Sequence, residues 1–199
     1  MDIAVQLPRI FQANADRFYR QVILPTLEQL CRDTALVTDK ALSLDEFLDQ
    51  CAKQIENHTA NEECKAFSLT LDGIFERQLS QWVTAYGEKC EGRNNLLAAS
   101  ARIGSIDLGT LGLEHGLREL HLVANIVRHG EGRSCLELRA IAPSLWHIEP
   151  SVDTIPAGFT PASEEMVILK ADLQRYASTI VRFWGYLDQL PMAVIHPPY

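Results

Sequence analysis

Apolar residues recur every three to four positions along most of the chain, a pattern that predicts helices. The first such segment covers residues 9–32. Pro25 is expected to kink or divide it, because proline lacks a backbone N–H and its ring collides with the preceding turn. The last segment covers residues 170–190 and carries its apolar residues on one side. Both segments should be amphipathic helices that pack on a common core.

Two more helices are expected between them. Ser43 and Glu46 form a capping box, in which a hydroxyl and a carboxylate satisfy free amides at a helix start. The helix that they open should run to about Asn57. Asn61 is the expected N-cap of the next helix, because two glutamates follow it. The apolar rhythm of that helix continues until Gly87.

Some segments lack a helical period. Residues 88–110 contain three glycines and an Asn-Asn pair, so we expect a long loop with a short helical turn at 96–101. Residues 144–163 contain three prolines and a glycine, which also predicts a long loop. Residues 166–169 could form a short extended segment. The tail, residues 191–199, ends in Pro-Pro-Tyr and is expected to be extended.

The most informative segment covers residues 118–133 and predicts a buried helix that ends at His129-Gly130. Its polar residues fall within one arc of about 100°, and apolar residues cover most of the remaining circumference. Such a helix is packed on most sides, and its polar stripe faces a cleft or a partner. Ser134 and Glu137 form a second capping box, for a short helix that should end near Ala142. The polar stripe consists of Glu114, Arg118, His121, Asn125, Arg128 and His129.

Together these elements predict a single all-α domain over residues 1–199, an antiparallel bundle of four to five long helices with short accessory helices. No apolar run could cross a membrane and no signal peptide is evident, so we expect a cytoplasmic protein without a membrane partner. The net charge of −8 disfavours a protein that coats nucleic acid, but it leaves room for a local basic cleft. Five scattered cysteines show no zinc-ligand spacing, so we expect reduced thiols and neither metal nor cofactor.

The polar stripe carries the candidate catalytic groups. An imidazole can take and give protons near neutrality, and an adjacent guanidinium can hold a phosphate. His129 would move the proton of a ribose 2′-hydroxyl or of the leaving group, while Arg128 stabilises the pentacovalent phosphate and Asn125 orients it. His121, two turns earlier, is a candidate second proton carrier. Glu131 is the acidic candidate. These groups would cleave RNA without a metal ion.

Ordinary structural roles are open for the same residues. His129 can cap the last carbonyls of its helix, with Gly130 as the left-handed residue that follows. Glu114 and Arg118 are four residues apart, a spacing that favours a salt bridge. Asn125 in a buried helix can satisfy a neighbouring backbone group.

The stretch Ala-Asn-Ile-Val-Arg-His-Gly, residues 124–130, resembles the signature of HEPN domains, all-α bundles found in prokaryotic RNase toxins and phage-defence proteins. Their motif is Arg, then a polar residue that is often Asn, then about three residues, then His, often followed by Gly. The Asn, His and Gly of this stretch match it. The Arg of the motif falls on Ala124, and Arg128 or Arg118 could substitute on the same face.

The resemblance implies a protein of a bacterial defence or toxin–antitoxin system that cleaves RNA without metal. It also implies a homodimer, in which two signature helices form a composite cleft, or a complex with a co-encoded protein. Ala124 favours another interpretation, a catalytically inactive HEPN-like module that binds a protein partner or regulates an effector. A third interpretation is a helical antitoxin or immunity-type binder, whose acidic charge would suit a basic partner.

Overall fold

The computed structural model describes residues 3–30, 41–146 and 162–199. These residues form helices and no β-strand, which confirms the all-α class. The elements are α1 (Ile3–Phe18), the π-helix η1 (Tyr19–Ile23), α2 (Leu24–Gln29), α3 (Leu44–Ala85), α4 (Arg93–Ile103), α5 (Glu114–His129), α6 (Arg133–Ile141), the 3₁₀ turns η2 (Pro143–Leu145) and η3 (Ser163–Glu165), and α7 (Lys170–Leu187).

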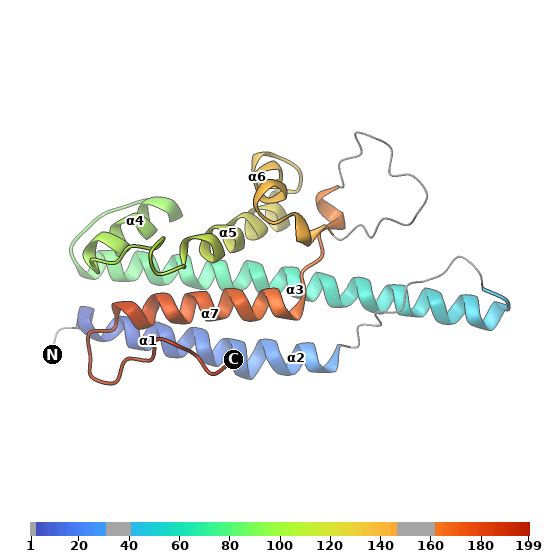
Figure 1. The fold of residues 1–199 in the computed structure, drawn as a ribbon, viewed down its shortest axis with the longest axis horizontal. Helices are drawn as coiled ribbons and strands as arrows, with labels where there is room; N and C mark the ends of the chain where they lie inside the picture. The colour runs from blue at the N-terminus through green and yellow to red at the C-terminus, as the bar shows by residue number, and fades with distance from the viewer. Residues whose placement is uncertain (1–2, 31–40, 147–161) are drawn as a thin grey trace.

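Four helices, α1, α3, α5 and α7, form the body of the molecule (Figure 1). The chain runs in one direction along α1 and α5 and in the opposite direction along α3 and α7. α7 packs on α1, α3 and α5, while α4 packs on α3 and α6 packs on α5. The core is built around the ring of Trp184, which meets Phe11, Phe75 and Trp82 in edge-on contacts.

Two prolines shape the first helical segment. Pro8 lies inside α1 and cannot donate a hydrogen bond to the carbonyl of Ala4. The indole N–H of Trp82 donates to that carbonyl instead, at 3.1 Å. Pro25 is the second residue of α2 and lies two positions after the end of η1, the π-helical turn. The wider π turn accommodates the proline ring, so the segment changes helix type at the point where a kink or division was predicted.

One helix, α3, replaces the two that were predicted over residues 43–87. It begins as expected, because Ser43 Oγ accepts a hydrogen bond from a backbone N–H of the first turn. Asn61, the predicted second N-cap, lies inside the helix. Its side-chain amide donates to Met166 O and accepts from Ile168 N, each at 2.9 Å. The two-helix prediction was wrong because Asn61 has these tertiary partners and no glycine or proline interrupts residues 44–72.

The predicted loop over residues 88–110 was also too long, since it contains the 11-residue helix α4. α6 forms where a short helix was predicted, but the capping box does not, because Gly132 is the N-cap and no side chain caps this end. Of the predicted loop at 144–163, residues 147–161 lie outside the described part of the chain. The following segment is extended at Met166 and Leu169, as predicted.

The C-terminal tail lies along α1. The side-chain amide of Gln12 donates to Val194 O. The ring centroids of Tyr19 and Tyr199 are 4.6 Å apart. Within the residues that the structure describes, no helix combines the length and the apolar character needed to cross a membrane.

Candidate functional site

The polar stripe of α5 faces a pocket of about 530 Å³ between α4, α5 and α6. Three of the predicted site residues, Arg118, His121 and Asn125, line this pocket. The opposite sides of α5 are buried against α3 and α7, which accounts for the apolar circumference of this helix within one chain. The first part of the stripe therefore faces a cleft, while its last two residues, Arg128 and His129, lie outside this pocket.

His121 is held between two side chains. Its Nδ1 lies 3.2 Å from Oδ2 of Asp72, whose side chain has no exposed surface. An ionised carboxylate only accepts, so Nδ1 carries the proton and Nε2 is the acceptor nitrogen. The amide nitrogen of Asn125 donates to that Nε2 at 3.3 Å. The imidazole side chain keeps 21% of its surface exposed and lines the pocket, so the neutral imidazole offers Nε2 as an acceptor there.

Asp72 is also bound by Arg93, the first residue of α4. Arg93 Nε donates to Asp72 Oδ1 at 2.9 Å, and its Nη2 donates to Leu117 O at 2.9 Å. Burial alone would raise the pKa of Asp72, but the hydrogen bond from His121 and the charge of Arg93 outweigh it, so this pKa lies below its ordinary value. Asp72 is therefore ionised at neutral pH. The same contacts attach α4 to α3 and α5, which explains why a helix forms in the predicted loop.

Sequence reasoning missed both Asp72 and Arg93. Asp72 occupies a fully buried position of α3, next to Leu71 and three residues before Phe75. An acidic residue on the apolar side of a helical rhythm is the signal that could have identified it. Arg93 lay in a segment without helical periodicity, and nothing in the sequence distinguished it from other arginines.

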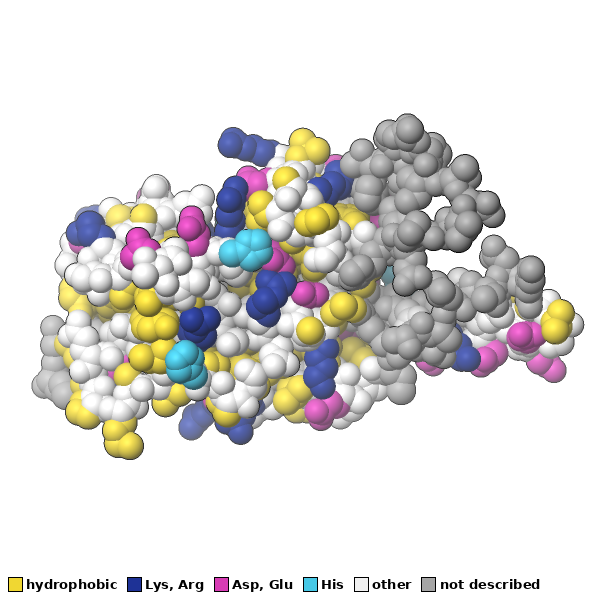
Figure 2. Space-filling view, viewed as in Figure 1, with side chains coloured by type: hydrophobic (Ala, Val, Ile, Leu, Met, Phe, Trp, Pro, Cys, Tyr) yellow, Lys and Arg dark blue, Asp and Glu magenta, His cyan; other side chains and the backbone are white. Residues whose placement is uncertain are grey.

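The rim of the pocket carries charges of both signs. Arg118 donates through Nε and Nη2 to Glu137 Oε1, at 2.9 and 2.6 Å, and not to Glu114 as predicted. The first two residues of α6, Arg133 and Ser134, also line the pocket. A helix N-terminus attracts anions through its free amides and its dipole. Lys, Arg, Asp and Glu side chains are interspersed on the face shown in Figure 2, so this face has no continuous basic surface.

The other predicted site residues lie outside this pocket. Arg128 is exposed and lines a neighbouring hollow of about 430 Å³ that His121 also borders. His129 is exposed at the last position of α5 and lines neither. The helix ends at Gly130, whose φ of 70° is left-handed, as predicted. Glu131 accepts hydrogen bonds from Arg139 and from a backbone N–H of η3, so it holds the start of α6 in place.

The position that corresponds to the motif's Arg is fully buried. Ala124 has 0% of its surface exposed, so no side chain reaches the pocket from there. Of the two proposed substitutes, Arg118 lines the pocket with His121, whereas Arg128 borders only the neighbouring hollow.

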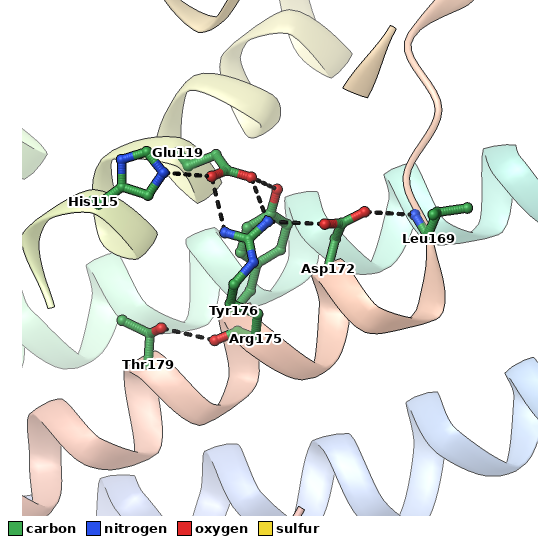
Figure 3. Close-up of polar contacts among 7 residues, drawn as sticks. All are labelled: His115, Glu119, Leu169, Asp172, Arg175, Tyr176 and Thr179. Carbon is green, nitrogen blue, oxygen red and sulfur yellow. Dashed lines mark hydrogen bonds and ion pairs between the residues drawn. The ribbon is translucent and has the colours of Figure 1, made fainter. Parts of the chain in front are cut away.

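A second buried polar network lies on the opposite side of α5 (Figure 3). Arg175 of α7 donates to both carboxylate oxygens of Glu119, at 2.9 and 2.7 Å, and Tyr176 Oη donates to Oε1 at 2.7 Å. Burial would raise the pKa of Glu119, but these hydrogen bonds and the charge of Arg175 lower it. Burial and the charge of Glu119 raise the pKa of Tyr176. These contacts join α5 to α7.

Among the described residues, no group of three or more His, Cys, Asp and Glu side chains is placed to hold a metal ion. Among the described cysteines, Cys51, Cys90 and Cys135 are free thiols. No family model matches the chain, and no curated protein or solved structure is significantly similar to it.

Proposed function

We propose that this protein is a HEPN-like, metal-independent endoribonuclease of a bacterial defence or toxin–antitoxin system, with His121 as its proton carrier. The observation that carries the proposal is the Asp72–His121 pair in the wall of the pocket. A buried carboxylate that holds Nδ1–H fixes the tautomer of the imidazole and stabilises the imidazolium that forms when Nε2 takes a proton. The resemblance to the HEPN signature supports RNA as the substrate.

In the proposed reaction, Asn125 releases His121 Nε2, which then takes the proton of a ribose 2′-hydroxyl. The 2′-oxygen attacks the adjacent phosphorus, the bond from phosphorus to the 5′-oxygen breaks, and the leaving oxygen takes a proton from water. The imidazolium of His121 then returns its proton to the hydroxide that remains. The products are a 2′,3′-cyclic phosphate and a 5′-hydroxyl. Arg118, Arg133 and the N-terminus of α6 would stabilise the negative charge of the pentacovalent phosphate, with Arg118 exchanging Glu137 for the substrate.

The test is cleavage of a labelled RNA in EDTA, with mass analysis of the new 3′ ends. We expect His121→Gln to lower the rate by about 100-fold or more, because a positioned general base contributes that much. His115→Gln changes an exposed histidine of the same helix and serves as the matched control. His129→Gln should also retain activity, since His129 lies outside the pocket. Loss of activity in His129→Gln but not in His121→Gln would move the site to the end of α5 and refute this assignment.

A catalytically inactive HEPN-like module that binds a protein partner or regulates an effector is the second candidate. It is favoured by the burial of Ala124 at the position of the motif's Arg, and by the existing pairing of Arg118 with Glu137. This candidate predicts that wild type and His121→Gln leave RNA equally intact and bind the partner equally well. In both proposals the protein acts in the cytoplasm, as a homodimer or with a co-encoded protein, and the neighbouring reading frames would identify that protein.

A further inference from the structure

The first part of α3, residues 44–59, projects beyond the other helices (Figure 1). We call it the α3 arm. None of its residues is buried, and the first buried residue of α3 is Ala60. The arm nevertheless carries large apolar side chains with high exposure, namely Leu44 (71%), Phe47 (53%), Leu48 (55%) and Ile55 (67%). Clustered exposure of this kind marks a surface that packs against something else.

Four of the arm residues form one continuous seam. Leu44, Leu48, Cys51 and Ile55 are separated by four, three and four positions, which is the spacing of the a and d positions of a coiled coil. At 3.6 residues per turn, this arm seam points about 150° away from the side of α3 that carries core residues such as Phe75. The seam therefore does not continue the face that packs in the bundle, and the core formed by residues 3–30, 41–146 and 162–199 does not cover it.

We propose that the arm seam pairs in antiparallel orientation with the arm seam of a second copy of this chain. In that pairing Leu44 meets Ile55 of the second copy and Leu48 meets Cys51, so every seam residue has an apolar neighbour. The pairing is independent of the proposed nuclease activity, because no arm residue lines the pocket that contains His121.

The charges of the arm fit a second copy. The residues that flank the seam over 44–55 are Asp45, Phe47, Ala52 and Gln54. Of these four residues, only Asp45 is charged. In the antiparallel pair Asp45 falls beside Ala52 of the second copy, and no like charges meet across the seam. The other charges of the arm, Glu46, Asp49, Lys53 and Glu56, lie outside the seam and its flanks, so they point away from the second copy. An anionic lipid surface would meet them and repel the arm, which argues against the membrane as the occupant.

Sedimentation velocity on the full chain, from low to high micromolar concentration, tests the pairing. We expect a concentration-dependent dimer in wild type. Leu48→Glu should raise the dissociation constant by about 100-fold or more, because a leucine leaves the interface on both copies. Gln50→Glu adds the same charge away from the seam and should leave the dimer unchanged, and circular dichroism checks that both variants stay helical. A monomeric wild type, or equal effects of the two substitutions, would overturn the proposal.

A disulfide cross-link tests the orientation. In a Cys51→Ser background, Leu44→Cys and Ile55→Cys place thiols about 16 Å apart within one helix, too far to bridge. We expect oxidation to link position 44 of one copy to position 55 of the other, as identified by peptide mapping. Links between two copies of position 44 would overturn the antiparallel arrangement. Binding of the arm to a different protein without any self-association would overturn the second copy as occupant.

Discussion

Replacing Asp72 by Asn tests whether the buried charge pair holds the pocket together. The substitution keeps the shape of the side chain and removes its charge. Arg93 would then be a buried cation, with 3% of its side chain exposed, whose remaining acceptors are neutral groups such as Leu117 O. Removing one partner of a buried ion pair costs about 3–5 kcal/mol, and we expect a loss of unfolding free energy in this range.

A double substitution separates the charge effect from the loss of packing. Arg93→Met together with Asp72→Asn removes both charges, so no uncompensated ion remains in the interior. We expect the double variant to be more stable than Asp72→Asn alone. The measurement is urea unfolding of the four proteins at pH 7, followed by circular dichroism. If the double variant loses as much unfolding free energy as the two single variants together, these charges do not stabilise one another.

The same pair predicts a pH dependence. Folding lowers the pKa of Asp72 below its ordinary value, so the charged form stabilises the folded state. This stability is fully present above the unfolded pKa of about 3.9 and is lost as the pH falls toward the folded value. Asp72→Asn has no such group. The difference in unfolding free energy between wild type and variant should therefore become smaller below about pH 4. If this difference in unfolding free energy stays constant down to pH 2.5, the pKa of Asp72 is not lowered by folding.

Two other substitutions test contacts elsewhere in the bundle. Glu119→Gln should cost about 1–3 kcal/mol, less than Asp72→Asn, because Arg175 is 41% exposed and water can solvate it; an equal or larger cost in urea unfolding would contradict this reasoning. Gly185→Ala would bring a Cβ into overlap with the carbonyl of Val194 and within 2.6 Å of Gln12 Nε2, so the tail must move away from α1 and α7. We expect faster proteolysis of residues 191–199 and a loss of about 1–3 kcal/mol, and an unchanged cleavage rate would show that the tail is not held there.

The sequence predicted α5 and α7 well because their signals are local. The apolar rhythm of α5 extends over its whole length, and a left-handed glycine ends it at Gly130. The single helix α3 and the helix α4 were not predictable in this way. Both depend on contacts between residues far apart in the chain, those of Asn61 with the segment after η3 and those of Arg93 with Asp72. Propensity and capping patterns contain no information on such contacts.

The candidate residues were predicted on one stripe of α5, and the structure brings only some of them, Arg118, His121 and Asn125, to the pocket. Helical periodicity places His121, Asn125 and His129 on one stripe, and it does not say where the cleft beside that stripe ends. The pocket is closed by α4 and α6, so it includes the middle of α5 and not its last turn. Residue spacing therefore predicts which face of α5 is polar. Which of the two histidines lines the pocket depends on the positions of the neighbouring helices.

The two buried carboxylates beside α5 explain why chemistry is expected on only one side of this helix. Both oxygens of Glu119 accept hydrogen bonds from α7, and its partners Arg175 and Tyr176 are donors that stay protonated at neutral pH. That network therefore joins two helices, and its exposed imidazole, His115, lies outside the pocket. Asp72 instead binds an imidazole, whose second nitrogen is an acceptor in a residue that lines the pocket. The side of α5 that carries His121 thus combines a buried carboxylate with an imidazole that lines the pocket, whereas His115, the imidazole that contacts Glu119, does not line it.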